Sequence, residues 1–256
     1  MKGFLEYVPG ESLLHRMNPV AKLACALLVS VACFCTANLA FLAVVLAFDF
    51  VLAVRCGLAR QAAGLARAVA VFSAVLALIA LLTTPEGAVL AVLPWGYIGT
   101  GSVLAAVVIV LRLVACAVPL FLVLYVTKLS DLANALVKIV HVPYKYAFTF
   151  TSAVRFIPMF MNDMAGIMEA QTARGVAFDG GIMKRLRLMA PLAVPLLVSS
   201  VRKTNSAAIA AEVRGFTLRT RASGYKEYPF AARDGIALAA CVAFLAAAVA
   251  VGIVAG

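Results

Sequence analysis

The sequence is poor in the residues that bind metals. Its two histidines, His15 and His141, lie far apart in the chain. Its six cysteines show no paired spacing: five fall inside apolar runs, at positions 25, 33, 35, 116 and 241, and Cys56 lies at the edge of one. Buried thiols of this kind behave as small apolar side chains. The pattern argues against a zinc site, a redox motif and a disulfide framework.

Motifs for nucleotide binding and for intramembrane catalysis are also missing. The sequence contains no G-x-x-x-x-G-K-[ST] phosphate loop, so any nucleotide would have to be bound by partner proteins. A membrane-embedded enzyme would need His, Asp or Glu side chains clustered at one level of the membrane. The sequence offers only one clear intramembrane acid, Asp49. We therefore predict a chain that is not an enzyme and that binds no cofactor, no metal and no nucleic acid.

Charged residues are scarce and apolar ones abundant. Of the 256 residues, 13% are charged and 65% are hydrophobic, and the mean hydropathy is +1.06. Average soluble domains are about 45–50% apolar, so the composition predicts an all-α integral membrane protein. A spanning helix needs roughly 20 mostly apolar residues, and five runs approach that length: 20–35, 39–54, 68–82, 103–126 and 235–254. No apolar core precedes residue 20, which predicts that the first span is not a cleaved signal peptide.

The basic residues predict the topology of these spans. The chain has 22 Lys and Arg against 11 Asp and Glu, a net charge of +11. Apart from Arg112, the basic residues lie near the N-terminus, in the loop after the second run, or between Lys128 and Arg233. Cytoplasmic loops carry the excess of Lys and Arg. Five spans with a cytoplasmic N-terminus and an external C-terminus place every basic loop inside.

Residues 127–235 are too long and too regularly patterned for a simple loop. Ser130 followed by Asp131 predicts a helix start, because a hydroxyl caps the first turn and an acid favours the N-terminal dipole. Pro143 is expected to end that helix. The predicted organisation is a four-helix membrane region over 1–126, a cytoplasmic or interfacial helical region over 127–234 and a last span over 235–256.

Two long amphipathic helices are predicted inside this region. The first covers 144–174 and is kinked at Pro158, and the second covers 182–214, with an early kink at Pro191 and Pro195. A turn signal at residues 179–181, Asp-Gly-Gly, separates them.

Both long helices are predicted to end in Arg-Gly. Ala173-Arg174-Gly175 closes the first, and Val213-Arg214-Gly215 closes the second. One interpretation is plain capping, with glycine at C′ and arginine on the last carbonyls. The other is docking, because a guanidinium presents five donors in a rigid, always charged fork that suits a groove on a soluble partner. Two such ends on similar helices favour docking, and an arginine can serve both purposes.

Several motifs in order along the chain resemble the transmembrane T component of energy-coupling factor (ECF) transporters, the EcfT/CbiQ family. They are residues 12–19 with Lys22-Leu23, then Arg155-Phe156-Ile157-Pro158, Ala190-Pro191-Leu192 and the two Arg-Gly ends. The departure is Val213, where the family's short motif often has alanine. The resemblance covers most of the chain.

The resemblance implies a subunit of an ABC importer in the plasma membrane of a prokaryote. It implies that the tripeptides ending in Gly175 and Gly215 dock on two ABC-type ATPases, and that a small membrane-embedded S component binds the substrate. ATP-driven closure would move the coupling helices and tip the S component, releasing a vitamin or a metal ion such as cobalt or nickel inside. The alternatives are a permease of a conventional ABC importer, which predicts one coupling helix per subunit, and a membrane scaffold that does not transport.

Two further sets of residues remain open to two interpretations. Asp49 and Arg112 could form an intramembrane ion pair, or Asp49 could lie near the inner interface, since Arg55 follows closely. Apolar side chains of the first long helix could be plain core or a platform for the S component, because methionines make adaptable surfaces. The platform candidates are Phe148, Phe156, Met159, Phe160 and Met168.

Overall fold

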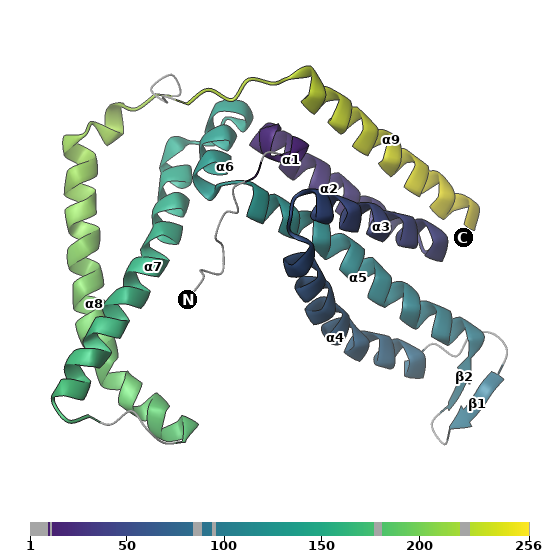
Figure 1. The fold of residues 1–256 in the computed structure, drawn as a ribbon, viewed down its shortest axis with the longest axis horizontal. Coiled ribbons are helices and arrows are strands. Elements are labelled where there is room, and N and C mark those ends of the chain that lie inside the picture. Colours follow the sequence, from purple (N-terminus) through teal and green to yellow (C-terminus); the bar gives the residue numbers. More distant parts are fainter. Residues whose placement is uncertain are drawn as a thin grey trace. The chain divides into compact units, whose positions relative to one another are not determined.

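The computed structural model describes residues 10, 12–83, 89–93, 96–176, 181–220 and 226–255, and it confirms the all-α fold class (Figure 1). The α-helices are α1 (Leu13–Arg16), α2 (Pro19–Cys35), α3 (Leu39–Arg55), α4 (Ala59–Thr83), α5 (Thr100–Val126), α6 (Leu129–Ala135), α7 (Tyr144–Ala173), α8 (Ile182–Val213) and α9 (Ala232–Ala255). Two short elements add to them, a π-helix η1 (Leu136–Val140) and a 3-10 helix η2 (Phe216–Leu218).

The one departure from helix in the described chain is a hairpin between α4 and α5. Strand β1 (Val89–Leu93) pairs antiparallel with β2 (Gly96–Gly99). This stretch lies between the third and fourth predicted apolar runs, 68–82 and 103–126. The predicted turn at residues 179–181 cannot be compared with the structure, because 179 and 180 lie outside the described residues.

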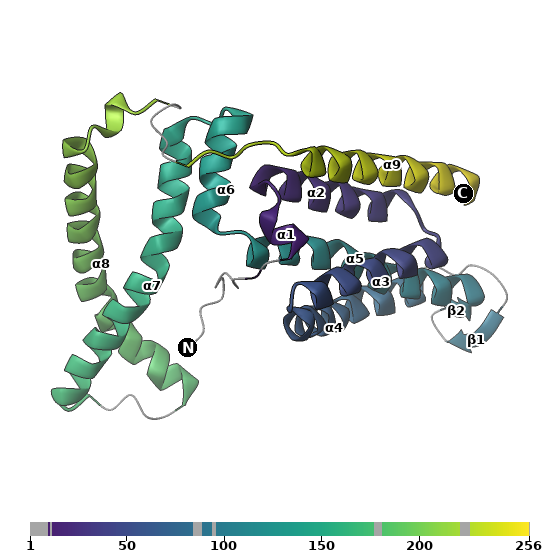
Figure 2. The same cartoon turned by 45° about the horizontal axis from the view of Figure 1, so that its top comes forward.

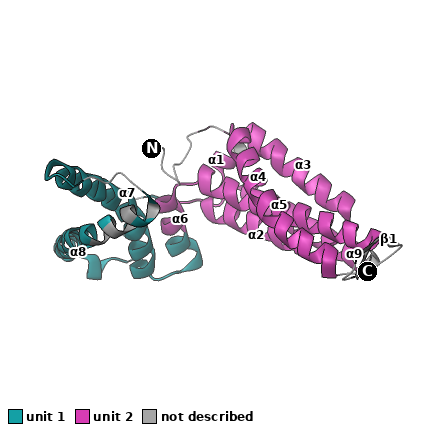
Figure 3. Cartoon of the chain, turned by 90° about the horizontal axis from the view of Figure 1, so that it is seen from below, with its two compact units in different colours: residues 1, 136–227 teal, residues 2–135, 228–256 magenta. Residues whose placement is uncertain are grey.

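The chain divides into two compact units (Figure 3). Residues 2–135 and 228–256 form what we call the membrane unit, and residues 136–227 form what we call the α7–α8 unit. The chain therefore leaves the membrane unit after α6 and re-enters it just before α9.

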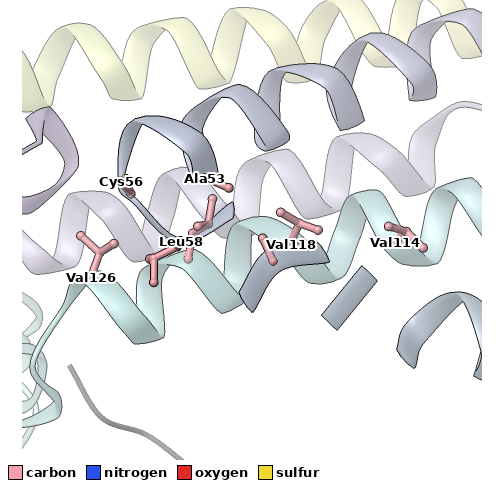
Figure 4. Close-up of a cluster of buried hydrophobic side chains, with 8 residues drawn as sticks. Ala53, Cys56, Leu58, Val114, Val118 and Val126 are labelled. Carbon is pink, nitrogen blue, oxygen red and sulfur yellow. The ribbon is translucent and has the colours of Figure 1, made fainter. Parts of the chain in front are cut away.

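Helix α5 is the centre of the membrane unit. It contacts α2, α3 and α4, and α2 in turn contacts α9, which lies along it in both views (Figures 1 and 2). A buried cluster joins the end of α3, the turn after it, α4 and α5 (Figure 4): Ala53, Cys56, Leu58, Ala62, Val114, Val118, Leu122 and Val126. A second cluster joins α2, α3 and α5: Cys33, Leu42, Val45, Val108 and Ala115.

Helix α9 approaches α2 very closely at one glycine. A methyl group placed at Gly252 would overlap the backbone carbonyl oxygen of Cys35, at the end of α2. Small residues allow this approach between membrane helices, whose association depends on close packing because lipid is as apolar as a side chain. Phe244 of α9 also stacks on Phe41 of α3, with ring centroids 4.9 Å apart.

Each of the five predicted apolar runs lies within one helix of the membrane unit. By length and composition, three described helices can cross a membrane: α4, α5 and the part of α9 from Ala232 to Ile253. Helices α2 and α3 have 17 residues each.

Helices α2 and α3 both begin at an asparagine cap. The side-chain oxygens of Asn18 and Asn38 accept from the first-turn N–H groups of Val20 and Ala40.

The helix predicted to be capped by Ser130 is capped two residues earlier. Helix α6 starts at Leu129, and the N–H groups of Asp131 and Leu132 donate to the carbonyl of Lys128. Lys128 therefore takes the capping position predicted for Ser130. The helix then widens into η1 and ends at Val140, before Pro143.

Candidate functional site

Helix α7 ends where the sequence predicted, at an Arg-Gly step. Gly175 has φ +87°, in the left-handed region that favours glycine. Its N–H donates to the carbonyl of Thr172 at 2.9 Å, and the N–H of Val176 donates to the carbonyl of Gln171 at 3.1 Å. This pair of bonds is a Schellman motif, which satisfies the last carbonyls with backbone donors. The guanidinium of Arg174 is therefore not needed to cap the helix.

Helix α8 ends in a related way. Gly215 has φ +72°, and its N–H donates to the carbonyl of Glu212 at 2.9 Å. The chain then continues directly into η2 rather than into an extended segment. The N–H of Arg214 donates to the carbonyl of Ala210 at 3.3 Å, so backbone donors again cover this helix end.

Both arginine tips are open to a partner. Ala173, Arg174 and Arg214 are exposed, and Val213 is 83% exposed. Within the described residues, neither guanidinium forms a side-chain hydrogen bond or an ion pair. Each guanidinium is therefore exposed, has no side-chain partner among the described residues and is not used for capping, which leaves it available for docking.

The two tips lie at opposite ends of an antiparallel helix pair. Asp163, in the middle of α7, contacts Lys203, in the middle of α8, while Phe148 near the start of α7 packs against Phe216 just after α8. Arg214 therefore lies near the beginning of α7 and Arg174 at its end. The stretch of α7 from Phe148 to Arg174 corresponds to roughly 39 Å of helix at ~1.5 Å per residue.

An ion pair fixes α7 against α8 near the middle of both. The ammonium of Lys203 lies 2.6 Å from both carboxylate oxygens of Asp163, and the hydroxyl of Ser199 donates to the same carboxylate at 3.3 Å. The hydrogen bond from Lys203 lowers the pKa of the Asp163 carboxyl below its ordinary value, so the acid stays ionised at neutral pH. This pair was not predicted from the sequence.

An aromatic cluster fixes the other end of the pair. The ring of Phe216 lies 4.8 Å from that of Phe148 and 5.6 Å from that of Tyr144. The guanidinium carbon of Arg219 lies 4.5 Å from the Tyr144 ring centre, and the same guanidinium donates to the Tyr144 hydroxyl at 2.7 Å. Tilted aromatic pairs at these distances and a cation over an aromatic face are favourable contacts. These contacts hold the end of α8, where Arg214 lies, against the start of α7.

The platform candidates have different surroundings. Phe148 belongs to the aromatic cluster just described, and Phe156 and Phe160 lie side by side on α7 with centroids 5.7 Å apart. Met159 is 37% exposed and Met168 is half-buried. Other large apolar side chains of the pair are also exposed, among them Phe150, Ile157 and Met161 on α7 and Val194, Leu197, Val198 and Val201 on α8. The α8 residues follow helical spacing, so they form one apolar stripe.

Of the two interpretations of Asp49 and Arg112, the ion pair is not seen among the described residues. Arg112 donates instead to the backbone carbonyl of Thr36 at 2.8 Å, at the end of α2. Asp49 is 2% exposed, and its Oδ2 has no hydrogen-bond partner in the part of the chain that the structure describes. Asp49 lines an apolar cavity of about 240 Å³ together with Cys25, Pro119 and Cys241. The two side chains lie at different levels along the helices. Arg112 reaches the α2–α3 turn, whereas Asp49 lies ten residues into α3.

The comparisons with known proteins agree with this architecture. A family model described as cobalt transport protein (CbiQ) matches residues 10–224. The chain is 29% identical to the energy-coupling factor transporter transmembrane protein EcfT of Bacillus selenitireducens, over 96% of this chain and 95% of that protein. The EcfT proteins of Brevibacillus brevis and Limosilactobacillus fermentum are 30% and 31% identical, over 90% and 93% of this chain and 91% and 93% of their own lengths. The chain therefore belongs to the CbiQ/EcfT family, the transmembrane T components of energy-coupling factor transporters.

Proposed function

We propose that this chain couples ATP hydrolysis by two ABC-type ATPases to a small substrate-binding S component, for the uptake of a vitamin or a metal ion. Arg174 and Arg214 each dock in a groove of one ATPase. The observation that carries the proposal is the pair of exposed arginine tips, each ending its helix at a left-handed glycine, at opposite ends of one helix pair.

The spacing of the tips supports two docking partners rather than one. Roughly 39 Å of helix between them, at ~1.5 Å per residue, is more than one side-chain groove can cover. Because Asp163 and Lys203 join the two helices in between, a displacement imposed at one tip is transmitted to the other helix. The arginines thus carry force and perform no bond chemistry.

The exposed apolar side chains of the same helices support an S-component platform. Large apolar groups such as Met161 and Leu197 are 59% and 64% exposed on helices that otherwise carry polar faces. Exposed apolar patches of this kind mark contact with a protein or with lipid. We assign the α7 set (Phe148, Phe156, Met159, Phe160 and Met168) and the α8 stripe to the S component.

The test is a detergent pull-down from cells that co-express the ATPases. We compare the wild-type chain with Arg174→Ala, Arg214→Ala and the double variant, and identify the bound proteins. Arg202→Ala is the matched control, because Arg202 is an exposed arginine in the interior of α8. We expect two ATPases and a small membrane protein with the wild type and with Arg202→Ala, reduced recovery with each single tip variant and loss with the double variant.

Two results would contradict the proposal. If the double variant recovers the ATPases as well as Arg202→Ala does, the arginines only complete the helix ends. If the wild type recovers no ATPase at all, the chain is a scaffold rather than a coupling subunit.

A further inference from the structure

Both chain connections between the two units meet at one hydrogen-bonded cluster. We call it the junction, and it consists of Asn18, Asp131, Tyr228 and Asp234, all within the membrane unit. Asp131 lies in α6, just before the chain leaves that unit, and Tyr228 is the first residue after the chain returns. The Tyr228 hydroxyl donates to Oδ1 of Asp131 at 3.2 Å, so one hydrogen bond ties the outgoing connection to the returning one.

The same tyrosine is bound to the start of α2. Its backbone carbonyl accepts from Nδ2 of Asn18 at 3.1 Å, while Oδ1 of Asn18 caps α2. Asn18 is 5% exposed. Every polar group of its side chain is therefore engaged, which fixes Tyr228 to the cap of a membrane helix.

Asp234 completes the junction from α9. Its Oδ1 accepts from the N–H of Asn18 at 3.1 Å, and its Oδ2 accepts from the N–H of Ala231 at 3.0 Å. Asp234 is 2% exposed, and its charge and that of Asp131 both lie near the buried ammonium of Lys22. Lys22 itself donates to the carbonyl of His15 at 3.3 Å. These two carboxylates partly offset the cost of burying the ammonium.

The Tyr228 hydroxyl stays protonated under working conditions. Burial, assisted by the carboxylate of Asp131, raises the pKa of Tyr228 to about 12, and the side chain of Asn134 also hydrogen-bonds the hydroxyl. A neutral phenol can donate to Asp131 at any pH at which the transporter works. The phenol therefore remains a donor to Asp131 at neutral pH.

We propose that the junction is where movement of α7 and α8 enters the membrane helices, with Tyr228, Asp131 and Asn18 as positioning residues for coupling. This rests on the proposed function. Both connections that leave the α7–α8 unit end on the cap of α2, so a pull on either connection displaces that cap. Without the tie, the outgoing connection no longer pulls on the cap, and only the returning connection, through the Tyr228 carbonyl, still does.

The experiment reads movement at two places in the assembled complex. The wild-type chain, co-purified with its ATPases and S component in nanodiscs, is labelled with an environment-sensitive maleimide at Cys35, the exposed native cysteine at the far end of α2. A second sample carries the label at Thr204→Cys on α8, in a Cys35→Ala background. Adding ATP should change the fluorescence at both positions.

The test variant is Tyr228→Phe, which removes one hydroxyl, and Asp131→Asn is the second. Tyr146→Phe is the control, because Tyr146 is 60% exposed on α7. We expect Tyr228→Phe to bind the ATPases, hydrolyse ATP and keep the response at residue 204. The response at Cys35 should fall roughly fivefold, the population change expected from losing the part-buried hydrogen bond to Asp131.

The outcomes separate this inference from the proposed function. If the wild type responds and both junction variants keep the full response at Cys35, the inference is wrong while the coupling function stands. If ATPase binding and both fluorescence responses fall together, the residues only support folding and the inference is again wrong. If the wild type recovers no ATPase, the proposed function fails and the inference falls with it.

Discussion

The two left-handed glycines decide where each arginine is presented. An L-residue with a β-carbon pays roughly 1–2 kcal/mol to adopt the left-handed conformation, whereas glycine does not. Replacing Gly175 or Gly215 therefore changes the helix end without touching the guanidinium. This separates the position of the arginine from its charge.

We expect Gly175→Ala to weaken ATPase recovery by roughly 5- to 30-fold, because ~1–2 kcal/mol of strain would shift the tip out of its docked conformation. Gly175→Asn should lose less, since asparagine tolerates this conformation better. The control is Gly166→Ala in the interior of α7, where a methyl group would meet nothing within 4 Å. Binding is measured by titrating purified ATPase onto immobilised protein. If Gly175→Ala and Gly166→Ala bind the ATPase with equal affinity, the left-handed helix end at Gly175 is not needed for docking.

At the scale of the helices, the α7–α8 pair depends on a partly exposed ion pair. The side chains of Lys203 and Asp163 are 36% and 21% exposed, so solvent screens part of their attraction. We expect Asp163→Lys and Lys203→Asp each to loosen the pair, and the double exchange to restore it. Hydrogen exchange of the α7 and α8 amides measures this, with Glu169→Lys, an exposed acid of α7, as the control.

The same pair predicts a dependence on acid pH. The folded-state pKa of Asp163 lies below the ordinary value of 3.8, so its stabilising effect is complete above that value and is lost as the pH falls through the lower folded-state pKa. The difference in thermal midpoint between the wild type and Asp163→Asn should be constant near neutral pH. It should shrink at acid pH, and a difference that persists there would contradict this account.

Packing of α9 on α2 gives a second test at this scale. Gly252→Ala would push a methyl group into the carbonyl of Cys35, and overpacking of this kind costs about 1–3 kcal/mol. Gly235→Ala in the same helix is the control, since a methyl group there has open space. We expect a lower thermal midpoint for Gly252→Ala in detergent, measured by the fraction that remains monodisperse. Equal midpoints would mean that α9 can move away from α2 without cost.

Local pattern predicted the elements well and their partners poorly. Helix α7 was predicted over 144–174 and runs from Tyr144 to Ala173, because apolar spacing, Pro143 and Gly175 are all local signals. The partner of Arg112 was left open by the sequence, because a backbone carbonyl such as that of Thr36 leaves no mark in it. The pairing of Asp163 with Lys203 depends on the antiparallel register of two helices, which no local signal specifies.

At the scale of the whole molecule, the distribution of charge predicts which ends of the helices face the cytoplasm. The hairpin region before α5 has no Lys or Arg, whereas α7, α8 and their connections carry many. The positive-inside rule then places the start of α5 outside and the α7–α8 unit inside. The proposed function requires the same arrangement, because ATPases are cytoplasmic and both arginine tips belong to the α7–α8 unit.

We test this with Thr100→Cys and Thr204→Cys, each in a Cys35→Ala background. Thr100 is exposed at the first residue of α5, and Thr204 is exposed on α8. In intact cells a membrane-impermeant maleimide should label residue 100 at once and residue 204 only after permeabilisation. The Cys35→Ala parent controls for the remaining cysteines, which are buried or half-buried. Labelling of residue 204 in intact cells would place the arginine tips outside, where ATP-driven partners could not reach them, and would overturn both the topology and the coupling role.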